Sequence, residues 1–407
     1  EEVHGLPVPR NSQQQREGID DSDDVPPLLA YYSNKGDITS SSLTTNEDIK
    51  MAVIIIHGSA RNADDYICSM SGALQHDLQK AYDPESEVLL LAPRFLAPED
   101  GVVELTNNNS GSNGRIEQPL RWSSGDPNSS YIRWTWRYGA DSIPNQYNGE
   151  GGGISSFRAV DAMVEFLADN DRNRFPNLER VVVVGHSAGG QFAHRWALTS
   201  MSSVWEDDGD RDRVDVIAHE QTSVDAQFIR KRSLSSRSPS SSVSIRAVAS
   251  NPRSFTYVNN KRFIGSTFQI PSQQDLDRCP SYDDWQWGFD TNVIGSIVAP
   301  YKDAAIAHAG GLDHLVRRYA RRNVLYVAGA LDTEHILGTC EDSYQGVNRF
   351  ERSDLFYRSL QDHLGNEDED EHGDSLERYQ TRMVVDDVGH DHALIFQSQA
   401  GIQAVFE

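Results

Sequence analysis

Four consecutive valines, Val181–Val184, run directly into Gly185-His186-Ser187-Ala188-Gly189, and this stretch constrains the fold more than any other. A run of β-branched residues is typical of a strand buried on both faces, as in the centre of a parallel sheet. The next segment, 191–198, predicts a helix. A serine between such a strand and such a helix lies on a sharp turn. Gly185 and Gly189 supply the small residues needed where strand and helix nearly touch.

Strand and helix patterns alternate through most of the chain, which predicts an α/β fold with a mainly parallel central sheet and helices on both faces. Apolar runs predict strands at 28–33, 51–56, 88–93, 181–184, 244–249, 323–329 and 383–385, and periodic apolar positions predict helices at 66–78, 155–169 and 301–321. Polar, acidic residues 1–25 indicate an exposed N-terminal arm, and residues 26–407 a single domain. Insertions at about 96–150, 205–241 and 253–322 are expected to build a cap over it.

Charge and hydropathy exclude several classes of partner. The net charge is −24, from 37 basic and 61 acidic side chains, which argues against nucleic acid and anionic membranes as partners. No apolar run approaches the roughly 18 residues of a membrane span. The chain begins without methionine, and sequons begin at Asn108 and Asn128. We therefore expect a secreted, mature protein, in which glycosylation of the sequons is an expectation for a eukaryotic source.

Polar residues follow several of the predicted strands, where ligands bind in parallel sheets. His57-Gly58-Ser59 follows the strand at 51–56, and Ser187, Asp332 and His390 each follow a later strand. Their order along the chain is serine, acid, histidine. This order and these strand-end positions fit the catalytic triad of the α/β-hydrolases.

The residue types explain the chemistry. A serine hydroxyl needs a base to take its proton during attack, and His390 would be that base. Asp332 would hold the imidazole in the correct tautomer and stabilise its cation. The backbone N–H groups of Ala188 and Ser59 are the expected oxyanion hole, because one follows the nucleophile and the other follows Gly58.

Other residues compete for two of these roles. Glu334 or Asp342 could replace Asp332 as the acid, and His392, His335 or His219 could replace His390 as the base. We interpret His57 as a structural residue that holds the oxyanion loop. His and acid clusters in this chain lack metal-ligand spacing, so no metal site is predicted.

The chain resembles serine hydrolases of the α/β-hydrolase superfamily, in particular a group of largely uncharacterised fungal and bacterial hydrolases. Polyester depolymerases and feruloyl-type esterases are more distantly similar. The matching segments are 56–63, 152–157, 185–192, 250–257 and 329–333, together with Gly389-His390-Asp391. The resemblance implies the α/β-hydrolase fold and the same triad over residues 28–400, and it is weak in the insertions, where the substrate is selected.

Several expectations follow from this resemblance and from the insertions. Cys279 and Cys340 fit the resembling group, and a disulfide between them would tie an insertion to the acid-bearing loop in an oxidising compartment. Tryptophans of the insertions are candidates for a substrate pocket, with packing inside the cap as the alternative: Trp134, Trp136, Trp285 and Trp287. The expected reaction is cleavage of a carboxylic ester through an acyl-serine, without a cofactor. The alternatives are a depolymerase of an ester-linked polymer or plant-wall ester, and a non-catalytic homologue that binds a ligand or partner.

Overall fold

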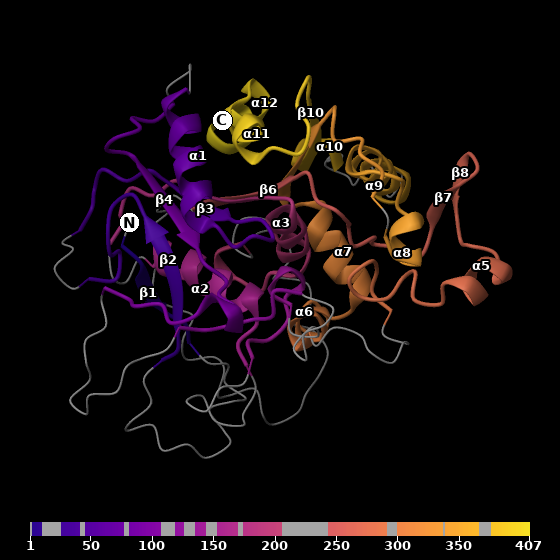
Figure 1. Cartoon of the computed structure of the whole chain (residues 1–407), viewed down its shortest axis with the longest axis horizontal. Coiled ribbons are helices and arrows are strands. Elements are labelled where there is room, and N and C mark those ends of the chain that lie inside the picture. Colours follow the sequence, from indigo (N-terminus) through magenta and orange to yellow (C-terminus); the bar gives the residue numbers. More distant parts are fainter. Residues whose placement is uncertain are drawn as a thin grey trace, which may run out of the picture.

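The computed structural model describes most of the chain (Figure 1). The described residues are 2–9, 26–40, 45–76, 81–106, 119–125, 135–143, 153–169, 174–205, 243–290, 299–336, 338–365 and 376–407. Among them, no helix is both long enough and apolar enough to cross a membrane.

An eight-stranded sheet in the order β1-β2-β4-β3-β5-β6-β9-β10 forms the centre of the molecule. Its strands are β1 (His4–Pro7), β2 (Leu28–Ser33), β3 (Met51–Ile56), β4 (Val88–Pro93), β5 (Arg180–His186), β6 (Ser244–Ser250), β9 (Asn323–Gly329) and β10 (Gln380–Val385). β2 is antiparallel to both its neighbours, and all pairs from β4 to β10 are parallel. All the carboxyl ends of those parallel strands therefore meet at one edge of the sheet.

Helices cover both faces of this sheet (Figure 1). One layer holds α1 (Ala63–Gln75), α11 (His392–Gln397) and α12 (Gln399–Phe406). The other holds α2 (Ser156–Leu167), α3 (Ala188–Thr199), α6 (Pro300–His308), α7 (Leu312–Ala320) and α9 (Arg349–Leu364). Short elements complete the fold: 3-10 helices η2 (Pro98–Asp100) and η4 (Trp136–Tyr138), helices α5 (Gln273–Arg278), α8 (Cys340–Ser343) and α10 (Leu376–Tyr379), and the antiparallel hairpin β7 (Arg262–Ile264) with β8 (Thr267–Gln269).

Alternate side chains of the central strands enter two separate cores. Val181 and Val183 of β5 pack in the core that includes α2 and α3, whereas Val182 and Val184 pack in the core that includes α1 and α12. This alternation follows from the two-residue repeat of a strand. It explains why a central strand is apolar at every position.

Two predictions of local structure were wrong. Residues His4–Pro7, assigned to an exposed arm, form β1 and pair with β2, so that Leu6 is fully buried. Residues 10–25 of that arm lie outside the described residues. The single helix predicted at 301–321 is two helices, because Gly310 and Gly311 between them take φ values of 81° and 127°. A left-handed backbone of this kind ends a helix.

The insertions are described only in part. In the first, Trp122 is fully buried and donates from its indole N–H to the carbonyl of Ile154, so this segment belongs to the main core. In the third, α5 and the β7–β8 hairpin extend to the outer side of the molecule, beside α8 and α9 (Figure 1). Of the second insertion, 205–241, only Trp205 is among the described residues, and it is buried.

Candidate active site

Ser187 occupies the turn between β5 and α3 in a strained backbone conformation. Its φ and ψ are 60° and −115°, a region that non-glycine residues rarely adopt. A Cβ on Gly185 would lie 2.2 Å from the carbonyl oxygen of Gly189, and one on Gly189 would lie 2.1 Å from that of Ile56. The backbone N–H of Ser187 donates to the carbonyl of Ser250 at 2.9 Å. Only glycine on both sides of the serine permits this turn.

Three side chains from three strand ends form one chain of hydrogen bonds. His390 Nδ1 lies 2.7 Å from Asp332 Oδ2, and His390 Nε2 lies 2.9 Å from Ser187 Oγ. A carboxylate only accepts hydrogen bonds, so Nδ1 carries the ring proton. The unprotonated Nε2 therefore accepts the hydrogen bond that the serine hydroxyl donates.

Among the described residues, none of the rivals hydrogen-bonds to Ser187, Asp332 or His390, which bond to one another. Asp342, in α8, accepts hydrogen bonds from Trp287 and Arg253. Glu334 and His335 are exposed. The ring of His392 stacks on Tyr66, with centroids 4.1 Å apart and an interplanar angle of 2°. His219 lies outside the described residues.

Asp332 is buried and has two further partners that sequence reasoning missed. Asn251 Nδ2 donates to Asp332 Oδ2 at 2.9 Å, and Arg349 donates to Oδ1 at 3.3 Å. Asn251 lies two residues after the strand predicted at 244–249, so the strand-end rule could have identified it. No sequence signal marked Arg349. These donors compensate the carboxylate for the loss of water around it.

The loop after β3 is held from two sides. His57 is fully buried; it accepts from the N–H of Phe95 at 3.0 Å through Nε2, so its Nδ1–H donates to the carbonyl of Gly58 at 2.8 Å. Burial lowers the pKa of His57 to about 4, and the ring is neutral at pH 7. The Tyr66 hydroxyl lies against Gly58, since a Cβ there would lie 2.6 Å from it. His57 is therefore suited to hold this loop rather than to transfer protons.

One predicted oxyanion donor, Ala188, follows Ser187, and the other, Ser59, lies on the loop after β3. Ala188 is the first residue of α3, where backbone N–H groups have no partner within the helix. Ser59 follows Gly58 and is exposed. A helix N-terminus also favours negative charge through its dipole.

His186 lies beneath the triad without joining it. Its ring centroid is 4.6 Å from that of His390, and the Tyr66 hydroxyl is 3.5 Å from its Nδ1. The side chain is buried, and burial lowers its pKa well below the usual value. His186 is therefore neutral and packs against His390.

Two of the four tryptophans predicted as pocket candidates pack inside the protein instead. Trp136 is fully buried and stacks on Phe95 with centroids 5.0 Å apart. Trp285 is also buried and donates to the carbonyl of Tyr138 at 3.0 Å. Both belong to the main core, because an aromatic ring in an insertion can seal a core as readily as it lines a pocket. Trp287 is half-buried, and Trp134 lies outside the described residues.

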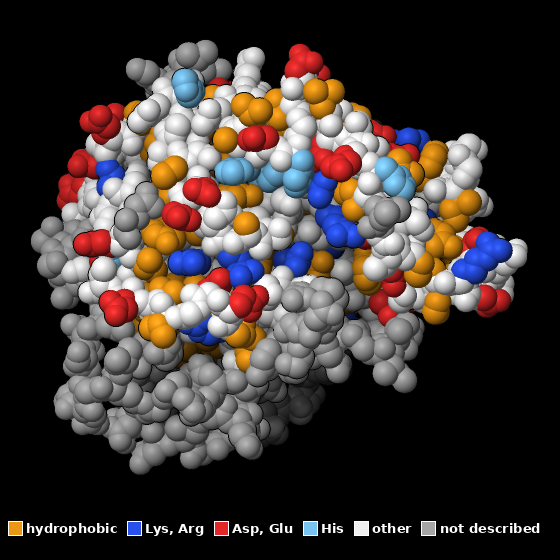
Figure 2. All heavy atoms as spheres, in the orientation of Figure 1, with side chains coloured by type: hydrophobic (Ala, Val, Ile, Leu, Met, Phe, Trp, Pro, Cys, Tyr) orange, Lys and Arg blue, Asp and Glu red, His pale blue; other side chains and the backbone are white. Residues whose placement is uncertain are grey.

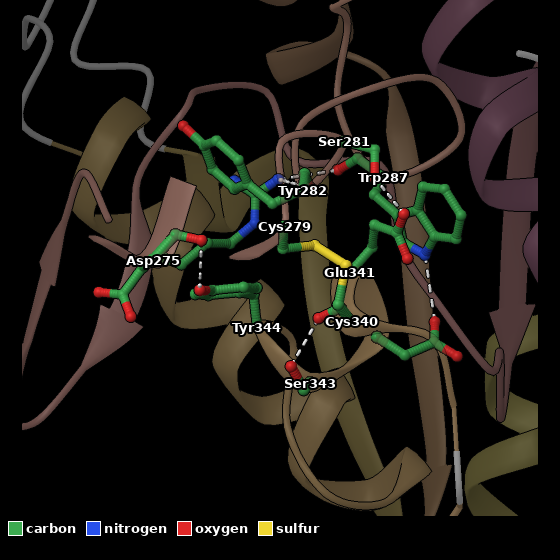
Figure 3. The surroundings of a disulfide bond; sticks show 11 residues. Asp275, Cys279, Ser281, Tyr282, Trp287, Cys340, Glu341, Ser343 and Tyr344 are labelled. Atoms are coloured by element: carbon green, nitrogen blue, oxygen red, sulfur yellow. Dashed lines mark hydrogen bonds between the residues drawn. A yellow bond between two sulfur atoms is a disulfide. The ribbon is translucent and has the colours of Figure 1, made fainter. Parts of the chain in front are cut away.

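The structure contains the disulfide between Cys279 and Cys340, which joins the end of α5 to the start of α8 (Figure 3). Ser281 donates to Glu341 beside it, and the Trp287 indole donates to Asp342 Oδ1 at 3.1 Å. Among the described residues, one cluster has its potential metal-binding atoms close together: Cys279, Cys340 and Glu341. Its two sulfur atoms are bonded to each other in the disulfide. The covalent link ties the third insertion to the segment that follows Asp332.

Figure 2 shows charged side chains of both signs on one face of the molecule. In Figure 2, histidine side chains gather on one face with Lys and Arg side chains beside and below them. The chain as a whole carries a net charge of −24. This face therefore presents basic side chains although the chain as a whole is acidic.

Comparisons with known proteins give distant likenesses only. No family model and no curated protein matches the chain. The poly(3-hydroxybutyrate) depolymerase LpqC from Bordetella parapertussis is similar at 15% identity and a TM-score of 0.44, covering 99% of this chain and 94% of that one. Poly(aspartic acid) hydrolase-1 from Sphingomonas sp. KT-1 is similar at 16% identity and a TM-score of 0.46, covering 100% and 99%. Likenesses this distant say nothing about the substrate of this chain.

The structure itself carries the assignment of fold. The second strand is antiparallel, the strands beyond it are parallel in the order β4-β3-β5-β6-β9-β10, and a serine lies on the strained turn after β5. This combination of a parallel sheet and a nucleophile elbow defines one architecture. The chain has the α/β-hydrolase fold.

Proposed function

We propose that the protein is a serine hydrolase that cleaves carboxylic esters through an acyl-serine intermediate. The observation that carries the proposal is the continuous hydrogen-bonded chain from Ser187 through His390 to Asp332, with distances of 2.9 and 2.7 Å. These are hydrogen-bond distances at which a general base can take a proton. The strained Ser187 backbone supports the same role, because strain of this kind concentrates at functional sites.

The proposed reaction has two halves. Ser187 Oγ attacks the ester carbonyl carbon while its proton moves to His390 Nε2. The tetrahedral intermediate then expels the alcohol, which takes that proton. Water next attacks the acyl-serine, losing a proton to His390, and the acid leaves as Ser187 regains its hydrogen. Every proton is accounted for, and no step needs a cofactor.

Two other groups complete the proposed machinery. Asp332 keeps the proton of His390 on Nδ1 and stabilises the imidazolium that forms. The N–H groups of Ala188 and Ser59 are proposed to bind the oxyanion, and one such donor is typically worth about 100- to 1,000-fold in rate.

Hydrolysis of p-nitrophenyl esters from acetate to decanoate tests this proposal, with Ser187→Ala as the matched variant. We expect the wild type to hydrolyse at least one ester and Ser187→Ala to fall to background. If the wild type hydrolyses none but a fluorophosphonate still labels Ser187, the substrate class is wrong, and polymeric esters come next. If it neither hydrolyses nor labels, the proposal is refuted and the alternative of a non-catalytic homologue that binds a ligand or partner is favoured.

We also propose that the protein works in an oxidising, extracytoplasmic compartment. The Cys279–Cys340 disulfide supports this, because such bonds persist mainly in secreted proteins. The sequons at Asn108 and Asn128 lie outside the described residues. Intact mass with alkylation, with and without reductant, tests the disulfide: three alkylated cysteines before reduction would contradict it.

A further inference from the structure

Asn251 is a buried residue at the carboxyl end of β6, between the nucleophile strand and the acid strand. It is 1% exposed and has a φ of 43°, a left-handed conformation that asparagine tolerates better than most residues. Its backbone N–H donates to the carbonyl of Val327 in β9 at 3.0 Å. The preceding residue, Ser250, accepts from the N–H of Ser187.

The side-chain amide of Asn251 makes three hydrogen bonds to the two loops of the acid and the base. Its Oδ1 accepts from the N–H of Gly329 at 2.9 Å. Its Nδ2 donates to Asp332 Oδ2 at 2.9 Å and to the carbonyl of Gly389 at 3.0 Å. Both hydrogens of the amide are used. The amide therefore has one orientation only, and it holds the acid and the residue before the base together.

Asp332 Oδ2 is the carboxylate oxygen that bonds to His390. It accepts from both Asn251 Nδ2 and His390 Nδ1. Because the amide fixes this oxygen and the backbone before His390 at once, it also fixes the angle at which the imidazole presents Nε2 to Ser187.

We infer that Asn251 is a positioning residue of the active site, which sets the geometry of the Asp332–His390 pair through its side-chain amide. This inference rests on the proposed function. It explains the residue type: aspartate has the same shape but would place a second carboxylate against Asp332, and glycine allows the backbone but offers no donor. Asparagine supplies two donors, one acceptor and a left-handed backbone together.

The first test is Asn251→Gly, which keeps the left-handed backbone and removes the amide. Loss of one hydrogen bond to a charged group corresponds to a factor of about 10 to 100 in an equilibrium or rate constant. We expect kcat for a p-nitrophenyl ester to fall about 10- to 100-fold, with KM changed by less than about threefold. The rate of fluorophosphonate labelling should fall in parallel. A kcat within about twofold of wild type would overturn the inference.

Asn34 offers a matched control. Its side chain also bridges backbone groups, accepting from Leu90 N–H at 2.8 Å and donating to the carbonyl of Val88 at 3.1 Å, but on β4. We expect Asn34→Ala to lower the melting temperature without changing kcat. Equal losses of kcat in the two variants would show that Asn251 acts through stability alone.

The second test is Asn251→Asp, which separates positioning from packing. The new carboxyl would face Asp332, whose other neighbours are His390 and Arg349. Two carboxyl groups this close share one proton at low pH, and that proton restores a donor toward Asp332. The ratio of variant to wild-type kcat should therefore be highest at low pH and fall as pH rises. A ratio independent of pH would contradict the inference.

The outcomes separate the two proposals. A wild type that neither hydrolyses esters nor reacts with fluorophosphonate refutes the proposed function. An active wild type with an unaffected Asn251→Gly refutes only the role of Asn251. If Asn251→Gly does not fold, as judged by circular dichroism, the pH dependence of Asn251→Asp decides the question.

Discussion

Asp332→Asn removes the negative charge from the triad while keeping the shape of the side chain. The imidazolium that forms on His390 then loses an ion pair whose atoms lie 2.7 Å apart. Two unit charges at about 4 Å interact by about 4 kcal/mol at an effective dielectric constant of 20. This corresponds to a rate factor of about 1,000, and partial exposure of His390 screens it toward about 100. We therefore expect kcat to fall about 100- to 1,000-fold.

The neighbours of Asp332 determine which way the new amide turns. If its nitrogen took the place of Oδ2, it would face donors on both His390 and Asn251. In the opposite orientation it faces only Arg349, whose hydrogen bond is longer, at 3.3 Å. The second orientation leaves one donor-donor conflict instead of two, so His390 keeps its proton on Nδ1. The loss should therefore stay below the roughly 10,000-fold seen where a triad histidine takes the wrong tautomer.

Steady-state hydrolysis of p-nitrophenyl butyrate by purified variants measures this loss, with circular dichroism as the check on folding. Asn251→Leu combined with Asp332→Asn removes one of the two conflicts on the Oδ2 side, so the new amide nitrogen can turn toward His390 and the loss should deepen. A kcat for Asp332→Asn within about fivefold of wild type would refute the electrostatic reasoning.

Three further predictions concern the stability of the folded protein. Trp136→Ala should lower the free energy of unfolding, measured in urea, by about 3–5 kcal/mol, because it leaves a cavity in the core. Trp287→Ala should lower it less, because this side chain is only half-buried. Equal losses in the two variants would contradict this reasoning. The Cys279–Cys340 bond closes a loop with a sequence separation of 61. Because the bond restricts the unfolded chain, its reduction should lower the free energy of unfolding by about 4 kcal/mol. An unchanged melting temperature after reduction would contradict this prediction. The pKa of His57 is about 4 in the folded state and has an ordinary value of 6.5. The unfolded chain therefore binds the proton more readily than the folded protein does. The free energy of unfolding should fall by about 3 kcal/mol as pH drops from 6.5 to 4. His57→Gln should flatten that pH dependence, and an unchanged slope would argue against a buried neutral His57.

The sheet could be predicted from sequence where local pattern and final environment agree. Met51–Ile56 and Asn323–Gly329 are apolar runs between turn residues, and both are strands with the predicted bounds. Ser187, Asp332 and His390 were predicted to lie together because parallel strands bring their carboxyl ends to one edge, and hydrogen bonds join them in the structure. The rule needs only that the strands be parallel, which the alternation of strand and helix patterns already predicts.

The rest depends on contacts between distant parts of the chain. β1 is only four residues long, and it is a strand because it pairs with β2. Its own amino-acid composition does not predict this pairing. The side chains of Trp136 and Trp287 have the same chemistry, yet one is sealed in the core and the other is half-buried. Arg349 reaches Asp332 from the start of α9, and only the fold brings them together. The helix at 301–321 differs from these, because Gly310-Gly311 was a visible signal for its break.

The most direct test of the account is the site of covalent labelling by a fluorophosphonate, mapped by peptide mass spectrometry in the wild type and in His390→Ala. The account predicts a single adduct on Ser187 in the wild type and a labelling rate at least about 100-fold lower in His390→Ala, because a general base contributes a factor of that order. An adduct on another residue, or equal labelling rates in the two proteins, would contradict the claim that His390 activates Ser187.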